Sequence, residues 1–368
     1  MVRNSLVALL ILLCPVCLFA TTPSISNVTG TVSQGQTLTI SGSTMVDEDK
    51  TNWINATSND GPDFTSGTSY GFEGSGPCNS DGSCSAGQDK YYWSPDDSNH
   101  RTLIYDSDIK LMGNKSLRGN DYGAEAGHNL STGAFFYTTD PTEMYVRWYS
   151  RWGSTGSNIW PTNHVKMIDL PASTNMWYWQ PPATGGTTLP TQLNMRYGDV
   201  DHYYTINNFL QLNRWYCFET RLKISSPLNW TTWVDNLQIA SATPSASDGV
   251  HLGWFLFNAP NLRGTDSTFN FTMWTDNMTV SSARVYCSTM VEICNSATYS
   301  GATCVKQPLT TISDNSIVIT ADLTGLTGDK YLYVTNNKQE TSSAYNLSGE
   351  TSPAKTVGGT LIQGAVCR

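Results

Sequence analysis

The chain has few charged residues and no sustained helical pattern. Asp, Glu, Lys and Arg make up only 14% of its 368 residues, while glycine, serine, threonine and asparagine are abundant. No stretch repeats apolar residues at helical spacing between capping residues. The sequence therefore predicts an all-β fold and disfavours a helical cytosolic enzyme.

Long apolar runs are missing everywhere except at the start. Arg3 precedes the apolar run from Leu6 to Phe19, and Ala20 follows it. This is the layout of a cleavable secretory signal. This run is shorter than the roughly 20 apolar residues of a membrane span. We expect residues 1–20 to be a signal peptide, the protein to be secreted or at the cell surface, and no integral membrane segment to remain after cleavage.

Tryptophan is absent from both ends of the chain. All 12 tryptophans lie between Trp53 and Trp274. About 348 residues after signal cleavage exceed what a single core usually holds. The distribution predicts a Trp-rich middle domain between two Trp-free ends.

Paired CxxC motifs and His-containing metal spacings are also absent, which disfavours a zinc site. Seven cysteines follow the signal, and in an exported protein we expect them to be oxidised where geometry permits. Cys78 and Cys84 bracket a turn-rich loop and are the first expected disulfide. Cys294 with Cys304 is the second expected disulfide. Because seven is an odd number, at least one cysteine cannot pair within the chain.

The two ends share the alternation of short β-strands. Residues 23–46 contain a proline-led strand, a Gly-Gln turn and a Thr-Ile-Ser-Gly strand. This passage resembles the opening of an immunoglobulin-like domain of the IPT/TIG type, and residues 330–336 resemble its closing strand. The resemblance implies a small Ig-like β-sandwich split between residues 21–47 and 284–350, with residues 351–368 as a tail. Two independent terminal segments are the alternative.

The middle, residues 48–283, contains frequent strand candidates separated by Gly, Pro and Asn turns, as in a sandwich or jelly roll. The clearest are Met144–Trp152, Val165–Leu170, Leu193–Tyr197, Trp215–Ile224, Leu252–Phe257 and Phe269–Val280. Five segments with the character of this fold follow one another along the chain. They are Lys115-Ser-Leu-Arg118, Tyr145-Val-Arg-Trp148, His164-Val-Lys-Met167, Arg214-Trp-Tyr-Cys-Phe-Glu219 and Trp274-Thr-Asp-Asn-Met-Thr-Val280. In this order they resemble the concanavalin A-like jelly rolls of lectins, laminin-G-type modules and secreted polysaccharide lyases. The resemblance implies an antiparallel β-sandwich jelly roll.

Two of these strands separate polar from apolar residues, because alternate side chains of a strand face opposite ways. One face carries Tyr145, Arg147, Tyr149 and Arg151 of the first strand, with Glu219 and Arg221 among the residues of the second. We predict a cationic and aromatic sheet face that binds a ligand. A solvated strand face is normally polar too, and that interpretation remains open.

Local charge favours an acidic ligand. Residues 144–223 contain seven cations and four acids, a net of +3 in a chain whose total is −9. A positive patch on an acidic protein indicates a polysaccharide or other glycan ligand, whereas nucleic acid would be repelled by the whole molecule. The ligand-binding candidates are Arg147, Tyr149, Arg151, Lys166, Arg196, Glu219, Arg221 and, as a stacking platform in a loop, Trp177 and Trp179.

The motifs of known enzymes are incomplete. The Glu-x-Asp-x-x-Glu motif that jelly-roll glucanases use is absent, so that type of glycosidase is disfavoured. A lyase needs a carboxylate neutraliser, a base and an acid, and Arg147, Tyr149, His164 and Lys166 supply those residue types. The specific motifs of alginate-lyase sandwiches are missing, so whether the protein is an enzyme is left open.

No cofactor is predicted except a structural Ca²⁺, which concanavalin A-like sandwiches often hold with oxygen ligands. Asp276 in the last predicted strand is the candidate ligand, and a turn or surface acid is the alternative. Three hypotheses remain: a secreted protein that binds an acidic polysaccharide, a lyase acting on a uronate-containing polymer, and a cell-surface or appendage subunit that self-assembles.

Overall fold

The computed structural model describes only part of the chain. The described residues are 22–46, 92–93, 101–122, 129–131, 134–137, 142–154, 165–169, 176–180, 192–197, 200–205, 210–223, 225, 227–243, 254–259, 261–263, 270–287 and 289–348. Within these ranges all regular structure is β and every strand pair is antiparallel. The prediction of an all-β, antiparallel fold is confirmed. The described part of the chain contains no helix with the length and hydropathy needed to cross a bilayer.

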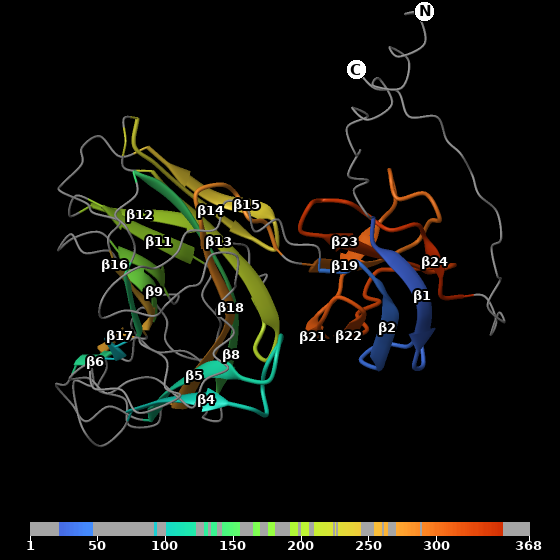
Figure 1. The fold of residues 1–368 in the computed structure, drawn as a ribbon, viewed down its shortest axis with the longest axis horizontal. Helices are drawn as coiled ribbons and strands as arrows, with labels where there is room; N and C mark the ends of the chain where they lie inside the picture. Colours follow the sequence, from blue (N-terminus) through green and yellow to red (C-terminus); the bar gives the residue numbers. More distant parts are fainter. Residues whose placement is uncertain are drawn as a thin grey trace, which may run out of the picture.

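The large domain is a sandwich of two seven-stranded sheets (Figure 1). The junction sheet, in the order β15-β14-β13-β8-β18-β5-β4, lies between the other sheet and the small domain. Its strands are β4 (Arg101–Asp106), β5 (Ser116–Tyr122), β8 (Glu143–Ser154), β13 (Trp215–Lys223), β14 (Asn229–Val234), β15 (Leu237–Ala242) and β18 (Asn270–Ser281).

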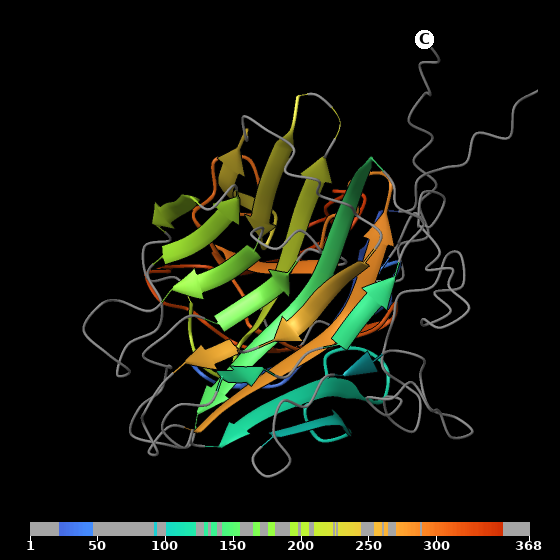
Figure 2. The same ribbon diagram turned by 90° about the vertical axis from the view of Figure 1, so that its left-hand side faces the viewer.

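The outer sheet has the order β12-β11-β10-β9-β16-β7-β3 and lies on the side away from the small domain, as Figures 1 and 2 show. Its strands are β3 (Tyr92–Trp93), β7 (Ala134–Tyr137), β9 (Val165–Asp169), β10 (Met176–Gln180), β11 (Gln192–Tyr197), β12 (Val200–Thr205) and β16 (Trp254–Ala259). A separate two-stranded sheet pairs β6 (Asn129–Ser131) with β17 (Asn261–Arg263).

The apolar faces of β8 and β13 supply large aromatic side chains to the core of the large domain. Trp148 stacks on Phe218 with ring centroids 5.5 Å apart, and Trp152 stacks on Tyr216 at 5.9 Å. All four are at most 2% exposed. Burying side chains of this size contributes about 1.5–3 kcal/mol each, so the alternation seen in the sequence places one face of each strand in the core.

The small domain is built from both ends of the described chain. One four-stranded sheet has the order β1-β2-β22-β21 and the other β20-β19-β23-β24. The strands are β1 (Ser24–Thr29), β2 (Thr37–Ser43), β19 (Thr289–Cys294), β20 (Cys304–Lys306), β21 (Leu309–Ile312), β22 (Ser316–Thr320), β23 (Tyr331–Asn336) and β24 (Tyr345–Asn346).

The pairing of β2 with β22 joins residues almost 280 positions apart in the sequence. Leu38 lies opposite Ile319 and Ile40 opposite Ile317, and all four are 0% exposed. This pairing is what a domain split between the chain ends requires. The IPT/TIG-type assignment stays a prediction, and residues 1–20 and 351–368 lie outside the described residues.

Two disulfides occur in the described part of the chain. Cys294 pairs with Cys304, as the sequence predicts, and links β19 to β20. Cys217 of β13 pairs with Cys287, just before β19, and the sequence analysis did not foresee this bond. Cys78 and Cys84 lie outside the described residues.

Candidate functional site

The polar face of β8 and β13 looks toward the small domain and is covered. Arg147, Tyr149 and Glu219 were predicted to contact a ligand, yet they are 0%, 1% and 0% exposed. The segment 282–287, which connects the two domains, packs over this face. The alternation of polar and apolar residues along a strand distinguishes its two faces, but it does not show what packs against each face. The prediction of an open groove at these three residues is therefore wrong.

Arg147 is a structural cation in this buried region. Its Nη2 donates to Asn277 Oδ1 at 2.6 Å and to Thr279 Oγ1 at 2.8 Å, and its Nη1 donates to the Tyr286 carbonyl at 3.3 Å. Burying a charged group is costly unless its hydrogen bonds are made, and these contacts satisfy both terminal nitrogens of the guanidinium. Arg147 thereby links the last strand of the jelly roll to the connecting segment, and neither the ligand-binding nor the catalytic role predicted for it fits.

Glu219 fixes the same segment from β13. Its carboxylate accepts hydrogen bonds from Arg284 Nε at 2.8 Å, Val285 N at 3.0 Å and Tyr286 N at 3.3 Å. The Arg284 guanidinium also lies over two rings, 4.0 Å from the Trp233 centroid and 4.2 Å from that of Tyr286. Charge-assisted bonds to backbone N–H groups hold the connecting segment to the sheet.

Tyr149 belongs to a hydrophobic cluster that crosses from one domain to the other. The cluster joins Tyr149, Trp215 and Trp274 of the junction sheet to small-domain residues that include Leu38 and Ile293. Tyr149 is therefore a packing residue, and its predicted ligand-binding and catalytic roles do not fit. The neighbouring Arg151 is partly buried, its guanidinium lies 5.7 Å from the Trp274 ring centroid, and burial lowers its pKa.

Asp276, the predicted Ca²⁺ ligand, is 0% exposed. Its Oδ2 accepts from Leu111 N at 2.7 Å and Met112 N at 2.9 Å, and its Oδ1 accepts from Asn277 N at 2.7 Å. The carboxylate thus anchors the loop that follows β4. Among the described residues no group of three or more His, Cys, Asp or Glu is arranged to hold a metal, and the structural Ca²⁺ stays a prediction.

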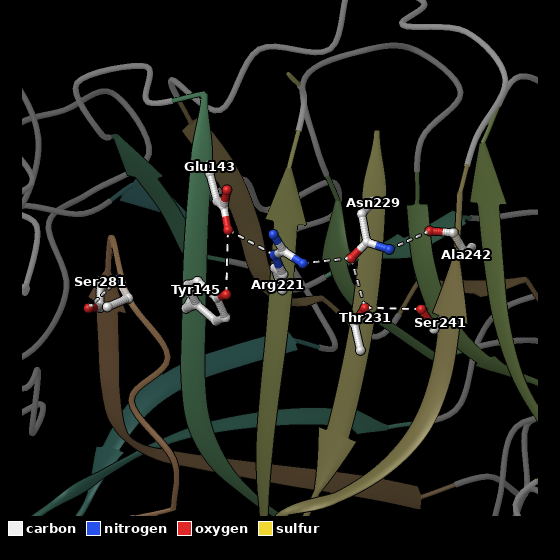
Figure 3. Close-up of polar contacts among 9 residues, drawn as sticks. Glu143, Tyr145, Arg221, Asn229, Thr231, Ser241, Ala242 and Ser281 are labelled. Atoms are coloured by element: carbon white, nitrogen blue, oxygen red, sulfur yellow. Dashed lines mark hydrogen bonds and ion pairs between the residues drawn. The ribbon is translucent and has the colours of Figure 1, made fainter. Parts of the chain in front are cut away.

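Arg221 lies at the far end of the same face, in a polar network (Figure 3). Its Nε donates to Glu143 Oε1 at 2.8 Å and its Nη1 to Asn229 Oδ1 at 3.2 Å. Thr231 Oγ1 also donates to Asn229 Oδ1, and lies 3.1 Å from Ser241 Oγ. The hydrogen bond to Glu143 is the main reason why the pKa of Arg221 is raised.

This network is partly open to solvent, with the Arg221 and Glu143 side chains 28% and 31% exposed. An ion pair at such a site contributes at most about 1 kcal/mol. Because Glu143 already neutralises Arg221, the network offers little net charge to an acidic ligand.

The outer sheet brings other predicted residues into one row. Lys166 of β9 lies opposite Tyr178 of β10, Tyr178 opposite Asn194 of β11, and Asn194 opposite Tyr203 of β12. Residues directly opposite one another in neighbouring strands share a face. Arg196, two residues beyond Asn194, shares that face and lies opposite Asp201.

The side chains of β12 show which way this face looks. Tyr203 is 49% exposed, whereas the hydroxyl of Tyr204 donates to the Ser241 carbonyl of the junction sheet. Tyr204 therefore points toward the interior of the sandwich, and the row that contains Tyr203 lies on the outward face of the sheet. Within this row Asn194 is 0% exposed, so it is not open to a ligand. This row, Lys166–Tyr178–Asn194–Tyr203 together with Arg196, is called the outer row below.

Trp177 and Trp179 belong to strand β10, not to a loop. Trp179 lies opposite Leu193, which is 1% exposed, and Leu193 lies opposite Tyr204. Both tryptophans hold register positions on the inward face, where a strand packs on its core. The prediction that they form a stacking platform in a loop is wrong in this respect. His164 lies outside the described residues.

The outer row contains three residues that the ligand-binding prediction did not include: Tyr178, Asn194 and Tyr203. Tyr178 stands between the two tryptophans in the sequence, and the period of two separates it from both. The sequence shows which residues of each strand share a face, because alternate residues do. The register that brings four strands into one row depends on turns that the sequence did not specify.

Comparisons with known proteins identify no relative. No protein-family model matches the chain, and no curated protein matches it. Three solved structures illustrate the resemblances found. A cellulose-induced protein, Cip1, is 19% identical, with 54% of this chain and 93% of that chain covered and a TM-score of 0.38.

The other two are enzymes. An endo-β-1,4-glucuronan lyase from the fungus Trichoderma reesei is 12% identical, with 52% of this chain and 90% of that chain covered and a TM-score of 0.38. The catalytic domain of a glycoside hydrolase family 131 protein from Coprinopsis cinerea is 10% identical, with 56% and 89% covered and a TM-score of 0.37. Likenesses this weak carry no argument about function, so the function is argued from the residues of this chain.

Proposed function

We propose that this protein binds an acidic polysaccharide on the outward face of the outer sheet. The observation that carries the proposal is the outer row, in which Lys166, Tyr178, Asn194 and Tyr203 occupy directly opposed positions on four neighbouring strands. Strands about 4.8 Å apart make such a row about 14 Å long. A row of that length matches an extended polymer better than a single small molecule.

The residue types of the outer row suit an acidic sugar. Lys166 and Arg196 can pair with carboxylates, and tyrosine combines an apolar ring with a polar tip. Lys166 lies opposite Tyr178 and Ala259, neither of which is acidic. A local cation of this kind concentrates an anionic ligand on a protein whose total charge is −9.

We further propose that the protein acts outside the cytosol. Two disulfides link described residues, and such bonds persist in oxidising compartments. The predicted signal at residues 1–20 supports the same location.

A lyase acting on a uronate-containing polymer is the second candidate. In β-elimination a base removes the C5 proton, the C4–C5 double bond forms as the bond from C4 to the glycosidic oxygen breaks, and that leaving oxygen takes a proton. Lys166 or Tyr178 could act as the base, Tyr178 or Tyr203 as the acid, and Arg196 could stabilise the charge that develops on the carboxylate. The adjacency of Lys166 and Tyr178 in the register favours this candidate.

Retention in affinity gels tests the binding proposal. We expect polyglucuronate, alginate or pectate in the gel to retard the protein and a neutral glucan not to. Lys166→Ala and Arg196→Ala should each weaken retention about tenfold, because each removes a charge-assisted contact worth roughly 1.5 kcal/mol.

Lys223→Ala is the matched control, since Lys223 ends β13 in the junction sheet and its loss changes the net charge equally. Equal weakening in all three variants would contradict the proposal. Absorbance of an unsaturated uronate product during incubation with the same polymers would identify the lyase, and its absence with retention intact would leave binding alone.

A further inference from the structure

Asn-x-Ser/Thr motifs mark asparagines to which a bulky, soluble sugar chain can be attached on the surface of an exported protein. Eight such motifs occur in the chain. The asparagine side chain is described in five of them, at Asn27, Asn114, Asn229, Asn277 and Asn346. A motif does not show whether the folded protein has room for a sugar, but the surroundings of these five asparagines do.

Three of the five asparagines are exposed. Asn27 lies on β1 and Asn346 on β24, and each strand is the last in the order of a small-domain sheet. Both strands lie on the side of the small domain away from the large domain (Figure 1). Asn114 follows Gly113, whose φ of 65° belongs to a turn in the loop between β4 and β5. A sugar at any of these three positions would extend into solvent.

The other two asparagines are engaged by the fold. Asn277 is 3% exposed, and its Oδ1 accepts the hydrogen bond from Arg147 Nη2 at 2.6 Å. Asn229 is half-buried, its Oδ1 accepts from Arg221 Nη1 at 3.2 Å, and its Nδ2 donates to the Ala242 carbonyl at 3.3 Å (Figure 3). A sugar attached to either amide nitrogen would disrupt these contacts, so the folded protein accommodates a sugar at neither position.

We propose that Asn27, Asn114 and Asn346 carry N-linked sugars in the exported protein, whereas Asn229 and Asn277 do not. In this modification the side-chain amide nitrogen bonds to the anomeric carbon of an oligosaccharide held on a lipid pyrophosphate. The lipid pyrophosphate leaves, and the amide loses one proton. Export, which the two disulfides support, is a condition of this modification, and the outer row plays no part in it.

Secretion of the full chain by cultured eukaryotic cells tests the proposal. Enzymatic release of the sugars converts each modified asparagine to aspartate, and peptide mass spectrometry locates the converted positions. We expect conversion at the three exposed asparagines and none at Asn229 or Asn277. Secreted protein that lacks a sugar at any of the three, or carries one at either engaged position, would overturn the proposal.

Thr29→Ala and Thr29→Ser form a matched pair of variants, because Thr29 is exposed and completes the motif at Asn27. Thr29→Ala should abolish the modification of Asn27 and leave that of Asn114 and Asn346 intact. Thr29→Ser should keep all three sugars, since the motif requires only a hydroxyl at that position. A sugar that persists on Asn27 in Thr29→Ala would contradict the assignment.

Two further readouts separate this proposal from the proposed function. A chain that stays in the cytosol without sugars would overturn both the export and the modification. Retention by acidic polysaccharide, measured on the same secreted protein, reports on the outer row alone, because β1 and β24 lie at the opposite end of the molecule from the outer sheet (Figure 1). Loss of retention with the three sugars in place would therefore contradict the outer row and leave the modification standing.

Discussion

Asp106 is a buried hydrogen-bond acceptor whose negative charge stabilises the folded state. It is 6% exposed and accepts from Trp274 Nε1 at 2.9 Å, Asp108 N at 2.8 Å, Ile109 N at 3.2 Å and Arg118 Nη1 at 3.1 Å. Burial acts to raise the pKa of Asp106, but the hydrogen bonds and the Arg118 charge outweigh it and lower the pKa below 3.8. The ionised form is therefore the one that stabilises the folded state.

We predict that Asp106→Asn lowers the free energy of unfolding at neutral pH by about 1–3 kcal/mol, because the amide cannot accept as many charge-assisted bonds. A group with a lowered folded-state pKa stabilises above its unfolded pKa, and this stability is lost as the pH falls through the folded pKa. The difference between variant and wild type should therefore shrink below a pH of about 3.8. Urea unfolding at several pH values measures it.

Asp108→Asn serves as the control, since Asp108 is exposed two residues away. A loss in Asp106→Asn that stays constant down to the lowest pH would show that the charge of Asp106 is not what stabilises the fold.

For single residues, the sequence predicted which strand face a side chain lies on better than it predicted what that side chain contacts. The alternation in Met144–Trp152 correctly separated Arg147 and Tyr149 from Val146 and Trp148. It carried no information on the connecting segment, whose Tyr286 lies 139 residues after Arg147 in the chain and which covers Arg147. Long-range contacts of that kind depend on domain packing, which a local period of two does not encode.

The connecting segment between the domains is held at several points. Cys287 is bonded to Cys217, and its N–H donates to Asn236 Oδ1 at 2.9 Å. Arg284 pairs with Glu219 at 2.8 Å. Together with the Arg147 contact to the Tyr286 carbonyl, these interactions attach residues 284–287 to the junction sheet and fix how the small domain leaves it.

We predict that the double variant Cys217→Ser/Cys287→Ser lowers the free energy of unfolding by about 2–4 kcal/mol, because the bond closes a loop of 70 residues in the unfolded chain. It should also split one calorimetric unfolding transition into two, since the domains lose a covalent link. The variant Cys294→Ser/Cys304→Ser, which removes a bond within the small domain, should keep a single transition. Two separate transitions in the wild type would contradict this account.

Strand positions were predictable, but their environment was not. The candidate at Met144–Trp152 lies within β8, and the predicted closing strand at residues 330–336 contains β23. In contrast, the segment with Trp177 and Trp179 was predicted to be a loop, and it forms β10. A short aromatic run between prolines fits either structure until its partners β9 and β11 are known.

The two domains form one packed unit in the described structure. A single hydrophobic cluster includes Tyr149, Trp215 and Trp274 of the large domain and Ile293 and Ile317 of the small one. Further contacts cross the junction, such as Ile312 N to the Leu111 carbonyl at 2.8 Å. The junction sheet is therefore covered by the small domain over much of its outward face, whereas the outer sheet lies on the side away from the small domain (Figure 1).

The central claim is that the ligand face is the outer sheet and not the polar face of β8 and β13. Backbone hydrogen exchange with and without an acidic oligosaccharide tests this claim most directly. We predict slower exchange in β9 to β12, residues 165–205, when the ligand is bound, with β8 and β13 unchanged. Slower exchange confined to β8 and β13, with β9 to β12 unaffected, would contradict the account.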